Sequence, residues 1–156
     1  MNGSSSDAYK IESLEWENLK LRLVGDLHYS HTMRTLYATD ASSYRILPAA
    51  VALPKTQDDI RQIVKFAIEH NIPLTPRAAG TSLSGQPIGR GIVVDVGRFM
   101  NQVLEVNKDE SWARIQPGVI RNELNEDLEP YGLFFGPETS TQNRAMIGGM
   151  MGNNSC

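Results

Sequence analysis

A strand–helix–strand pattern over residues 49–96 constrains the fold of this chain more than any other feature. Residues 49–53 form a short apolar run between Pro48 and Pro54, which is typical of a buried strand. Further apolar runs follow at residues 73–76 and 91–96. Because parallel strands need a long crossover connection, usually a helix, this spacing predicts a right-handed parallel βαβ unit.

The crossover between the first two of these strands is predicted to be an amphipathic helix. Thr56 can cap its N-terminus, and Asn71 suits a left-handed position at its end. Apolar residues recur at spacings of three and four, and we expect them to form the single face that packs on the sheet: Ile60, Ile63, Val64, Ala67 and Ile68.

The second and third strands are joined by residues 76–86, which we call the small-residue loop (Pro-Arg-Ala-Ala-Gly-Thr-Ser-Leu-Ser-Gly-Gln). Small side chains let backbone N–H groups approach a bound group, while hydroxyl groups and Arg77 add further donors. The loop also leaves the carboxyl end of a strand, which is where α/β sheets bind ligands. This pattern favours a nucleotide diphosphate site.

Other interpretations of the small-residue loop are weaker. Gly, Ser and Thr are common in any surface connection, so an ordinary loop is the plain alternative. A Walker A motif would need a lysine after the last glycine, and no lysine lies between Lys65 and Lys108. A Rossmann site would need Gly-x-Gly-x-x-Gly leading directly into a helix, which the loop does not show.

The second half of the chain is predicted to hold an antiparallel hairpin and a helix. Residues 103–106 and 112–116 flank a turn-forming segment. Residues 119–128 have a helical apolar period that ends at residues 130–132, and we expect a short strand at residues 133–135. The predicted fold class is α+β, with a small parallel βαβ subdomain followed by an antiparallel sheet with flanking helices.

The last eleven residues, 146–156, combine glycines and amides with Ile147 and three methionines. This mixture suits a flat, partly apolar ligand with polar edges, since Met and Ile pack against a ring while N–H and amide groups reach its heteroatoms. A frayed, glycine-rich terminus is the alternative. No helix cap or polar tail closes the sequence, so we expect it to be part of a longer protein.

The beginning of the chain carries fewer signals. We expect a flexible leader at residues 1–10 and an N-terminal helical segment at residues 11–45, including an amphipathic helix that ends near Gly25. His28 and His31 could share one helical face, but no third ligand of matching quality is near. Hydrogen-bonded or solvated histidines are therefore preferred to a metal site.

Charge and cysteine content narrow the class of partner. A net charge of −3 over 156 residues argues against nucleic acid or an anionic membrane surface as the main partner. Cys156 is the only cysteine, which excludes an internal disulfide. The sequence has no uncharged apolar run of membrane-spanning length and does not begin with a signal peptide. We expect a soluble, cytoplasmic protein with no transmembrane segment.

Several segments, in order, resemble one known family. The small-residue loop resembles the diphosphate loop of the FAD-binding domain shared by the p-cresol methylhydroxylase and vanillyl-alcohol oxidase superfamily. Residues 37–45, 51–56, 116–119 and 147–154 resemble signatures of its glycolate oxidase subunit and D-lactate dehydrogenase-like branch. The resemblance implies that residues 46–156 are the N-terminal part of an FAD-binding domain, with a first subdomain at 46–100 and the start of a second at 101–156.

The resemblance also implies which residues hold the cofactor. FAD should be bound non-covalently, because covalently linked relatives carry a histidine where this chain has Thr81. We expect the 156-residue chain alone to retain it weakly or not at all, since about half of the flavin-binding surface would come from elsewhere. Family loops often have glycines where Ala78 and Ala79 stand, which is a departure. The implied cofactor-binding residues are Pro76, Arg77, Ala78, Ala79, Gly80, Thr81, Ser82, Leu83, Gly85, Gln86, Pro137, Glu138, Thr139, Ile147, Gly148, Gly149, Asn153 and Asn154.

The implied activity is that of a flavin-dependent 2-hydroxy acid dehydrogenase with a D-lactate-like or glycolate-like substrate. The chain alone should be inactive, since the catalytic residues are expected outside it. An iron–sulfur module is an implied electron acceptor, and the full-length enzyme could be peripheral to the inner membrane. The alternatives are another oxidase or reductase of the superfamily, a nucleotide-binding module without a redox role, and a purely structural module.

Overall fold

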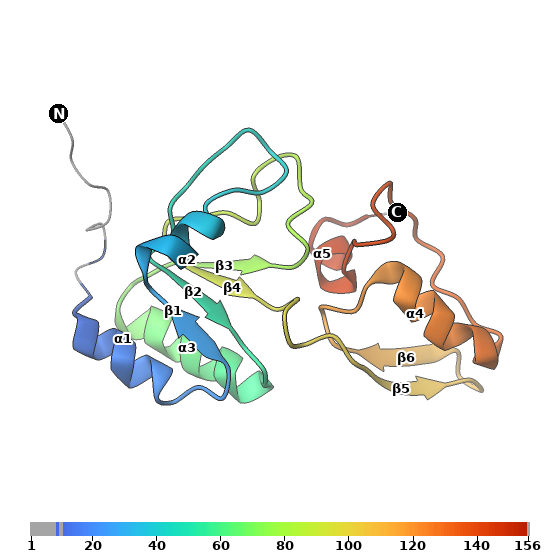
Figure 1. The fold of residues 1–156 in the computed structure, drawn as a ribbon. Helices are drawn as coiled ribbons and strands as arrows, with labels where there is room; N and C mark the ends of the chain where they lie inside the picture. The colour runs from blue at the N-terminus through green and yellow to red at the C-terminus, as the bar shows by residue number, and fades with distance from the viewer. Residues whose placement is uncertain (1–8, 10, 156) are drawn as a thin grey trace.

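The computed structural model describes Tyr9 and residues 11–155. These residues form two lobes that lie side by side in Figure 1, an N-terminal lobe of residues 9–96 and a C-terminal lobe of residues 103–155. The expected flexible leader lies outside the described residues except for Tyr9, which packs against the core of the N-terminal lobe.

The N-terminal lobe is built on a four-stranded sheet in the order β1-β2-β4-β3. The strands β2 (Ala50–Leu53), β4 (Ile92–Asp95) and β3 (Leu74–Arg77) are parallel, and β1 (Asp26–His28) is antiparallel to β2. The predicted parallel βαβ arrangement is therefore confirmed. Strand β4 lies between the two strands that helix α3 (Gln57–Glu69) connects.

Helix α3 begins and ends as the sequence predicts. The Thr56 hydroxyl accepts a hydrogen bond from the N–H of Asp59 at 3.1 Å, which caps the helix. Asn71 has a φ of 49°, so it takes the left-handed position that stops the chain from continuing as a helix.

The predicted apolar face of α3 is only partly right. Ile63 and Ala67 are buried, but Val64 is 40% exposed and Ile68 is 75% exposed. Phe66, which the periodicity argument omitted, is buried against the sheet in their place. Because the large Phe66 ring is buried, the face of α3 that packs on the sheet is centred on positions 63, 66 and 67. Val64 and Ile68, at one edge of the predicted apolar face, are therefore left exposed.

The N-terminal helix is shorter than predicted. Helix α1 (Ser13–Lys20) ends five residues before Gly25, and the buried side chains on it are Trp16 and Leu19. The Trp16 ring packs on Phe66 of α3 with centroids 5.1 Å apart. Gly25 lies outside the helix and directly against the Leu53 carbonyl oxygen, where any side chain would clash.

Strand β1 was not predicted, since its sequence holds one apolar residue, Leu27, between polar neighbours. Leu27 is buried and the flanking residues are half-buried, so the strand is defined by pairing with β2 and not by its own pattern. A short helix, α2 (His31–Leu36), follows it.

The C-terminal lobe contains the predicted hairpin and helix. Strands β5 (Val103–Asn107) and β6 (Trp112–Ile115) pair antiparallel. Helix α4 (Arg121–Leu128) continues as a 3₁₀ turn, η2 (Glu129–Tyr131), and stops at Gly132, whose φ is 69°. The core of this lobe lies between the hairpin and the helices and consists of Val119, Leu124, Leu128, Ala145, Ile147 and Met150.

The predicted strand at residues 133–135 is wrong. This segment is extended but pairs with no strand in the described part of the chain. Its Phe135 is held by the side chain of Asn125 on α4, which accepts from the Phe135 N–H at 2.6 Å and donates to the Phe135 carbonyl at 3.3 Å. One side-chain amide thus satisfies backbone groups that a partner strand would otherwise pair.

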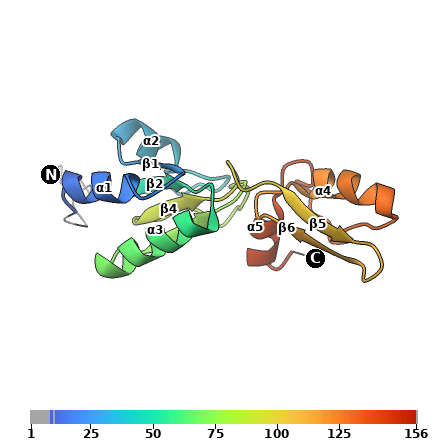
Figure 2. The ribbon, with the colours of Figure 1, turned by 90° about the horizontal axis from the view of Figure 1, so that it is seen from below.

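The two lobes meet at a narrow waist, visible in Figure 2. The N–H of Gly118 donates to the Met100 carbonyl at 2.7 Å. The N–H of Gly148, in helix α5 (Ile147–Gly152), donates to the Pro117 carbonyl at 2.8 Å. These bonds attach α5 to the waist, on the side where the small-residue loop leaves the sheet.

Candidate functional site

The small-residue loop begins in the last residues of β3 and crosses the end of the N-terminal lobe nearest the waist (Figure 1). Its residues from Ala78 to Ser82 are half-buried, and Leu83 is 78% exposed. Gly80 and Gly85 have φ values of 69° and 77°, a left-handed conformation that glycine adopts without a steric cost. The loop therefore turns sharply while remaining open on one side.

A run of backbone donors in the first part of this loop is unused among the described residues. Within the part of the chain that the structure describes, the N–H groups from Ala78 through Leu83 donate no hydrogen bond. Half-buried N–H groups normally find a partner, so a continuous run of free donors is a place for an acceptor to bind. An anion with several oxygens, such as a diphosphate, matches such a run.

Side chains in the loop make few bonds of their own. The Ser82 hydroxyl bonds to the Gln86 side chain and accepts from the Ser84 N–H at 3.2 Å. No hydrogen bond of the Thr81 hydroxyl is found among the described residues, so this group is available to a ligand. The Thr81 hydroxyl thus adds a donor beside the run of free N–H groups, whereas the Ser82 hydroxyl donates to Gln86.

Arg77 turns toward residues 37–45, which we call the covering segment. One terminal nitrogen, Nη1, donates to the Thr39 carbonyl at 2.8 Å, and the guanidinium carbon lies 5.2 Å from the centroid of the Tyr37 ring. A Cβ atom on Gly80 would lie 2.6 Å from Nη2 of Arg77. The guanidinium is therefore packed between the covering segment and the loop.

Tyr37 is tied to the sheet in turn. Its hydroxyl donates to Oδ2 of Asp95 at 2.7 Å, and Oδ1 of Asp95 accepts from the Gly97 N–H at 2.8 Å. Burial raises the pKa of Tyr37, and the hydrogen bond to Asp95 and its negative charge raise it further, while Arg77 acts in the opposite direction. The hydroxyl therefore stays protonated and remains a donor at neutral pH.

The covering segment touches the loop at two more places. The Ala41 N–H donates to the Gly80 carbonyl at 3.2 Å. Further along, a Cβ on Gly85 would lie 3.0 Å from the Tyr44 ring. The segment thus follows the loop from one left-handed glycine to the other.

Helix α5 brings the second group of predicted residues to the loop. A Cβ on Gly149 would lie 3.2 Å from the Cβ of Ala78, and a Cβ on Gly148 would lie 2.6 Å from the Cβ of Pro117. Only small residues allow this approach. The structure therefore brings together the two glycine-rich segments, although they are about seventy residues apart in the sequence.

Other predicted residues lie apart from the loop. Residues 137–139 are held by Arg121 of α4, whose Nε donates to the Pro137 carbonyl at 3.2 Å and whose Nη2 lies 3.6 Å from Oε1 of Glu138. Thr139 and Thr141 share a hydrogen bond of 3.0 Å between their hydroxyls. No hydrogen bond or ion pair joins these residues to the small-residue loop in the described structure.

Asn153 and Asn154 follow α5 and are exposed. The Asn153 N–H donates to the Gly149 carbonyl at 3.0 Å, and Asn154 is left-handed, with a φ of 50°. Both side chains are therefore accessible at the C-terminal end of α5.

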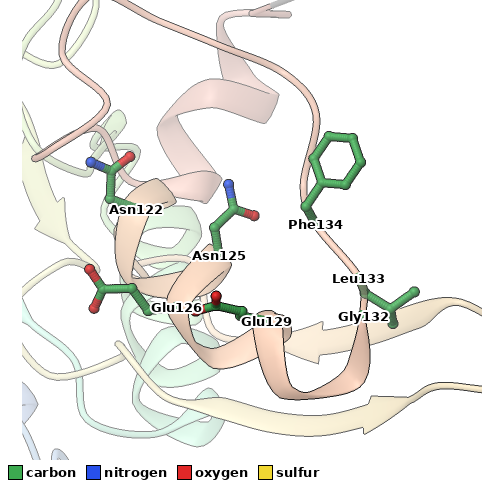
Figure 3. A pocket seen from close by; sticks show the side chains of 7 residues that line it. All are labelled: Asn122, Asn125, Glu126, Glu129, Gly132, Leu133 and Phe134. Atoms are coloured by element: carbon green, nitrogen blue, oxygen red, sulfur yellow. The ribbon is translucent and has the colours of Figure 1, made fainter.

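A separate hollow lies on the far side of α4. It has a volume of about 490 Å³ and is lined by Asn122, Asn125, Glu126, Glu129, Gly132, Leu133 and Phe134 (Figure 3). The hollow is open, and its walls are α4 and the extended segment that follows it. It shares no residue with the small-residue loop and so belongs to a different part of the surface.

The described residues form neither a candidate metal site nor a helix that could span a membrane. Among the described residues, no group of three or more His, Cys, Asp or Glu side chains is placed to hold a metal ion. His28 lies in β1 and His31 opens α2. No described helix combines the length and the apolar character that crossing a bilayer requires.

Comparison with known protein families shows which family this chain belongs to. A model described as "FAD binding domain" matches residues 48–156, which include the small-residue loop and α5. This chain is a member of the FAD binding domain family.

Two groups of curated relatives match the chain. D-2-hydroxyglutarate dehydrogenase of Escherichia coli (strain K12) is 42% identical over 130 residues, which cover 81% of this chain and 13% of the relative. The glycolate oxidase subunit GlcD of Bacillus subtilis (strain 168) is 36% identical over 129 residues, which cover 81% of this chain and 27% of that protein. The chain thus spans a small part of the length of these relatives.

Solved structures show the same fold. An alkyldihydroxyacetonephosphate synthase superposes with a TM-score of 0.77 at 23% identity, over 92% of this chain and 29% of the synthase. A 4-ethylphenol oxidase from Gulosibacter chungangensis has a TM-score of 0.58 at 23% identity, over 78% of this chain and 26% of the oxidase. These similarities confirm the predicted α+β fold.

The FAD binding domain has contacts that the sequence prediction did not include. Tyr37, Thr39, Tyr44 and Asp95 surround the loop, but none was among the predicted site residues. The two tyrosines lie in residues 37–45, which resemble a signature of the family but were assigned no role in the site. The contact of Tyr37 with Arg77 depends on the order of the strands, which the sequence did not predict.

Proposed function

We propose that the small-residue loop binds the diphosphate of FAD through its backbone N–H groups. The observation that supports this most directly is the run of unused donors from Ala78 through Leu83, at a sharp turn made possible by Gly80. Membership of the FAD binding domain family supplies the identity of the ligand. Thr81 cannot form the covalent link that a histidine makes, so the cofactor is held without a covalent bond.

The other predicted residues complete the site in this proposal. Gly148 and Gly149 offer a surface of small groups near Ala78, which suits the flat part of the cofactor, and Ile147 supports them from the core of the C-terminal lobe. Residues 137–139 and the amides of Asn153 and Asn154 line the adenosine and the approach to the flavin. When it is bound, the flavin supplies hydride acceptance from a substrate carbon.

We further propose that the domain serves an oxidoreductase that acts on D-2-hydroxy acids. Its most similar relatives include D-2-hydroxyglutarate dehydrogenases and a glycolate oxidase subunit. The chain spans 13–27% of these relatives, so the substrate base and carboxylate-binding groups lie outside it in this proposal. An iron–sulfur module as the electron acceptor and a cytoplasmic location belong to the same proposal.

Titration of the 156-residue chain with FAD tests the binding step. We expect weak but saturable binding, because association costs several kcal/mol and only part of the site is present. Gly80→Ala should weaken binding about tenfold or more, since its methyl group would press on the Arg77 guanidinium and disturb the turn.

Gly132→Ala is the matched control for this test. Gly132 has the same φ of 69° but has no neighbouring atom within 4 Å of an added Cβ, and it lies in the other lobe. It should lose a similar amount of folding stability and leave FAD affinity unchanged. Equal losses of affinity in both variants, or tighter binding of ADP than of FAD, would contradict the proposal.

The proposed activity needs the full-length polypeptide. Anaerobic addition of D-2-hydroxyglutarate, D-lactate or glycolate should bleach the flavin absorbance of that protein, with the greatest rate for one of the three. The 156-residue chain loaded with FAD should show no bleaching. A full-length protein whose bound flavin none of these acids reduces would contradict the assignment of substrate class.

A further inference from the structure

The Arg77 guanidinium is packed against the protein itself and donates one hydrogen bond within it. Nη1 donates to a backbone carbonyl of the covering segment at 2.8 Å, the guanidinium carbon is 5.2 Å from the Tyr37 ring, and Nη2 lies against Gly80. A guanidinium that is stacked and hydrogen-bonded in this way is fixed in one orientation. It is therefore a structural link between two segments.

Both ends of this link are anchored. Tyr37 is attached to the end of β4 through its hydroxyl and Asp95, 2.7 Å apart, and Asp95 also accepts from the Gly97 N–H. Arg77 itself is the last residue of β3, next to β4 in the sheet. The link therefore joins the covering segment to two adjacent strand ends of the sheet.

The covering segment has few other attachments to the loop. The Ala41 N–H reaches the Gly80 carbonyl at 3.2 Å, and the Tyr44 ring, which is 59% exposed, lies near Gly85. The segment has order of its own, since Thr39 and Arg45 form a bridge and Ala38 is fully buried. Its position against the loop, however, rests on these two contacts and on Arg77.

We infer that Arg77 is a positioning residue, which holds the covering segment against the small-residue loop and so keeps the loop's free N–H groups in place for a bound diphosphate. This inference rests on the proposed function for the identity of the ligand only. In this inference the backbone N–H groups from Ala78 through Leu83 recognise the diphosphate. The Arg77 guanidinium holds the covering segment and the small-residue loop together.

The test uses Arg77→Met, Arg77→Lys and Tyr37→Phe in the 156-residue chain. Hydrogen–deuterium exchange without any ligand should show the Ala41 amide exchanging at least about tenfold faster in both Arg77 variants, because the segment can now open locally. Tyr37→Phe should give a smaller acceleration. Amides of α3, such as that of Ile63, should exchange as in the wild type, which shows that the fold is intact.

The affinity for FAD shows whether Arg77 positions the loop or contacts the diphosphate directly. A phosphate can be bound by the point charge of a lysine, whereas a stacked, forked guanidinium cannot be replaced by it. Arg77→Lys should therefore lose FAD affinity as much as Arg77→Met, by about tenfold or more. The effects of Arg77→Met and Tyr37→Phe should also be non-additive in the double variant, because both act through one link.

Arg90→Met is the matched control, since Arg90 is exposed, lies shortly after the loop and makes no side-chain bond to another described residue. It should change neither exchange nor affinity. Unchanged Ala41 exchange in Arg77→Met would overturn the inference, as would wild-type FAD affinity in Arg77→Lys. If the wild-type chain binds no FAD, the proposed function fails, and the exchange experiment still decides the role of Arg77.

Discussion

The carboxylate of Asp59 shows how one residue can hold several segments. It is 1% exposed and accepts hydrogen bonds from four backbone N–H groups, those of Val24, Gly25, Lys55 and Thr56, at 2.8–3.1 Å. Asp59→Asn should destabilise the fold by about 2–4 kcal/mol, because an amide offers one acceptor oxygen and leaves buried N–H groups facing its own NH₂. Urea denaturation at pH 7 measures this loss.

Asp58→Asn is the matched control for Asp59→Asn. Asp58 is exposed, and its one ion pair with another described residue, Arg61 at 3.9 Å, is a surface pair, so the variant should lose less than about 1 kcal/mol. An equal loss for both variants would show that the buried hydrogen bonds of Asp59 do not stabilise the protein.

The pH dependence of the Asp59 contribution has a definite sign. Burial on its own raises the pKa of Asp59, but the four N–H groups together lower it below the ordinary value of 3.8. A carboxylate with a lowered folded-state pKa stabilises the fold above its unfolded-state pKa, and this stability is lost as the pH falls through the folded-state value. The difference between wild type and Asp59→Asn should therefore shrink below about pH 4, which denaturation curves at pH 7 and pH 3 would show.

At the scale of elements, Asn125 decides the conformation of the segment after α4. Asn125→Ala should free the N–H and carbonyl of Phe135 and cost about 1–2 kcal/mol, because it removes both hydrogen bonds to this residue. Hydrogen exchange should show a faster Phe135 amide. Asn122→Ala, in the same hollow of Figure 3, should leave that amide unchanged, since the Asn122 side chain bonds only to Arg121 among the described residues.

Elements with their own local signals could be predicted from the sequence. The capped helix α3, the hairpin of β5 and β6, and the glycine stop after α4 each depend on residues within a few positions of one another. Strand β1 and the segment at residues 133–135 could not be predicted, because pairing with β2 defines the first and the distant Asn125 side chain defines the second. The loop was found for the same reason as α3, since its small residues are contiguous.

The surroundings of the loop could not be predicted in this way. The contact between Tyr37 and Arg77 joins residues forty positions apart, and the contact between Ala78 and Gly149 crosses from one lobe to the other. Such meetings are set by strand order and by packing at the waist. A sequence pattern of period two or 3.6 carries no information about either.

For the whole molecule, the waist between the lobes sets the distance from the small-residue loop to α5. Gly118 is buried there, and a Cβ on it would lie 2.7 Å from the Met100 carbonyl oxygen and 2.9 Å from both the Gly97 Cα and the Val96 carbonyl oxygen. All three are backbone atoms that cannot move without shifting a lobe. Gly118→Ala should therefore cost about 1–3 kcal/mol and weaken FAD binding as well, because it separates α5 from the loop.

Gly97→Ala is the comparison that isolates this effect. Gly97 lies at the same waist, but the nearest atoms to an added Cβ are Sδ and Cε of Met146, at 2.5 Å and 2.8 Å. The end of a flexible thioether side chain can move aside, so this variant should lose less than about 1 kcal/mol and keep its FAD affinity. Thermal denaturation and FAD titration of the two variants measure both quantities. Equal behaviour of the two would mean that the lobes adjust to each other freely, and the loop and α5 would then not form one site of fixed shape.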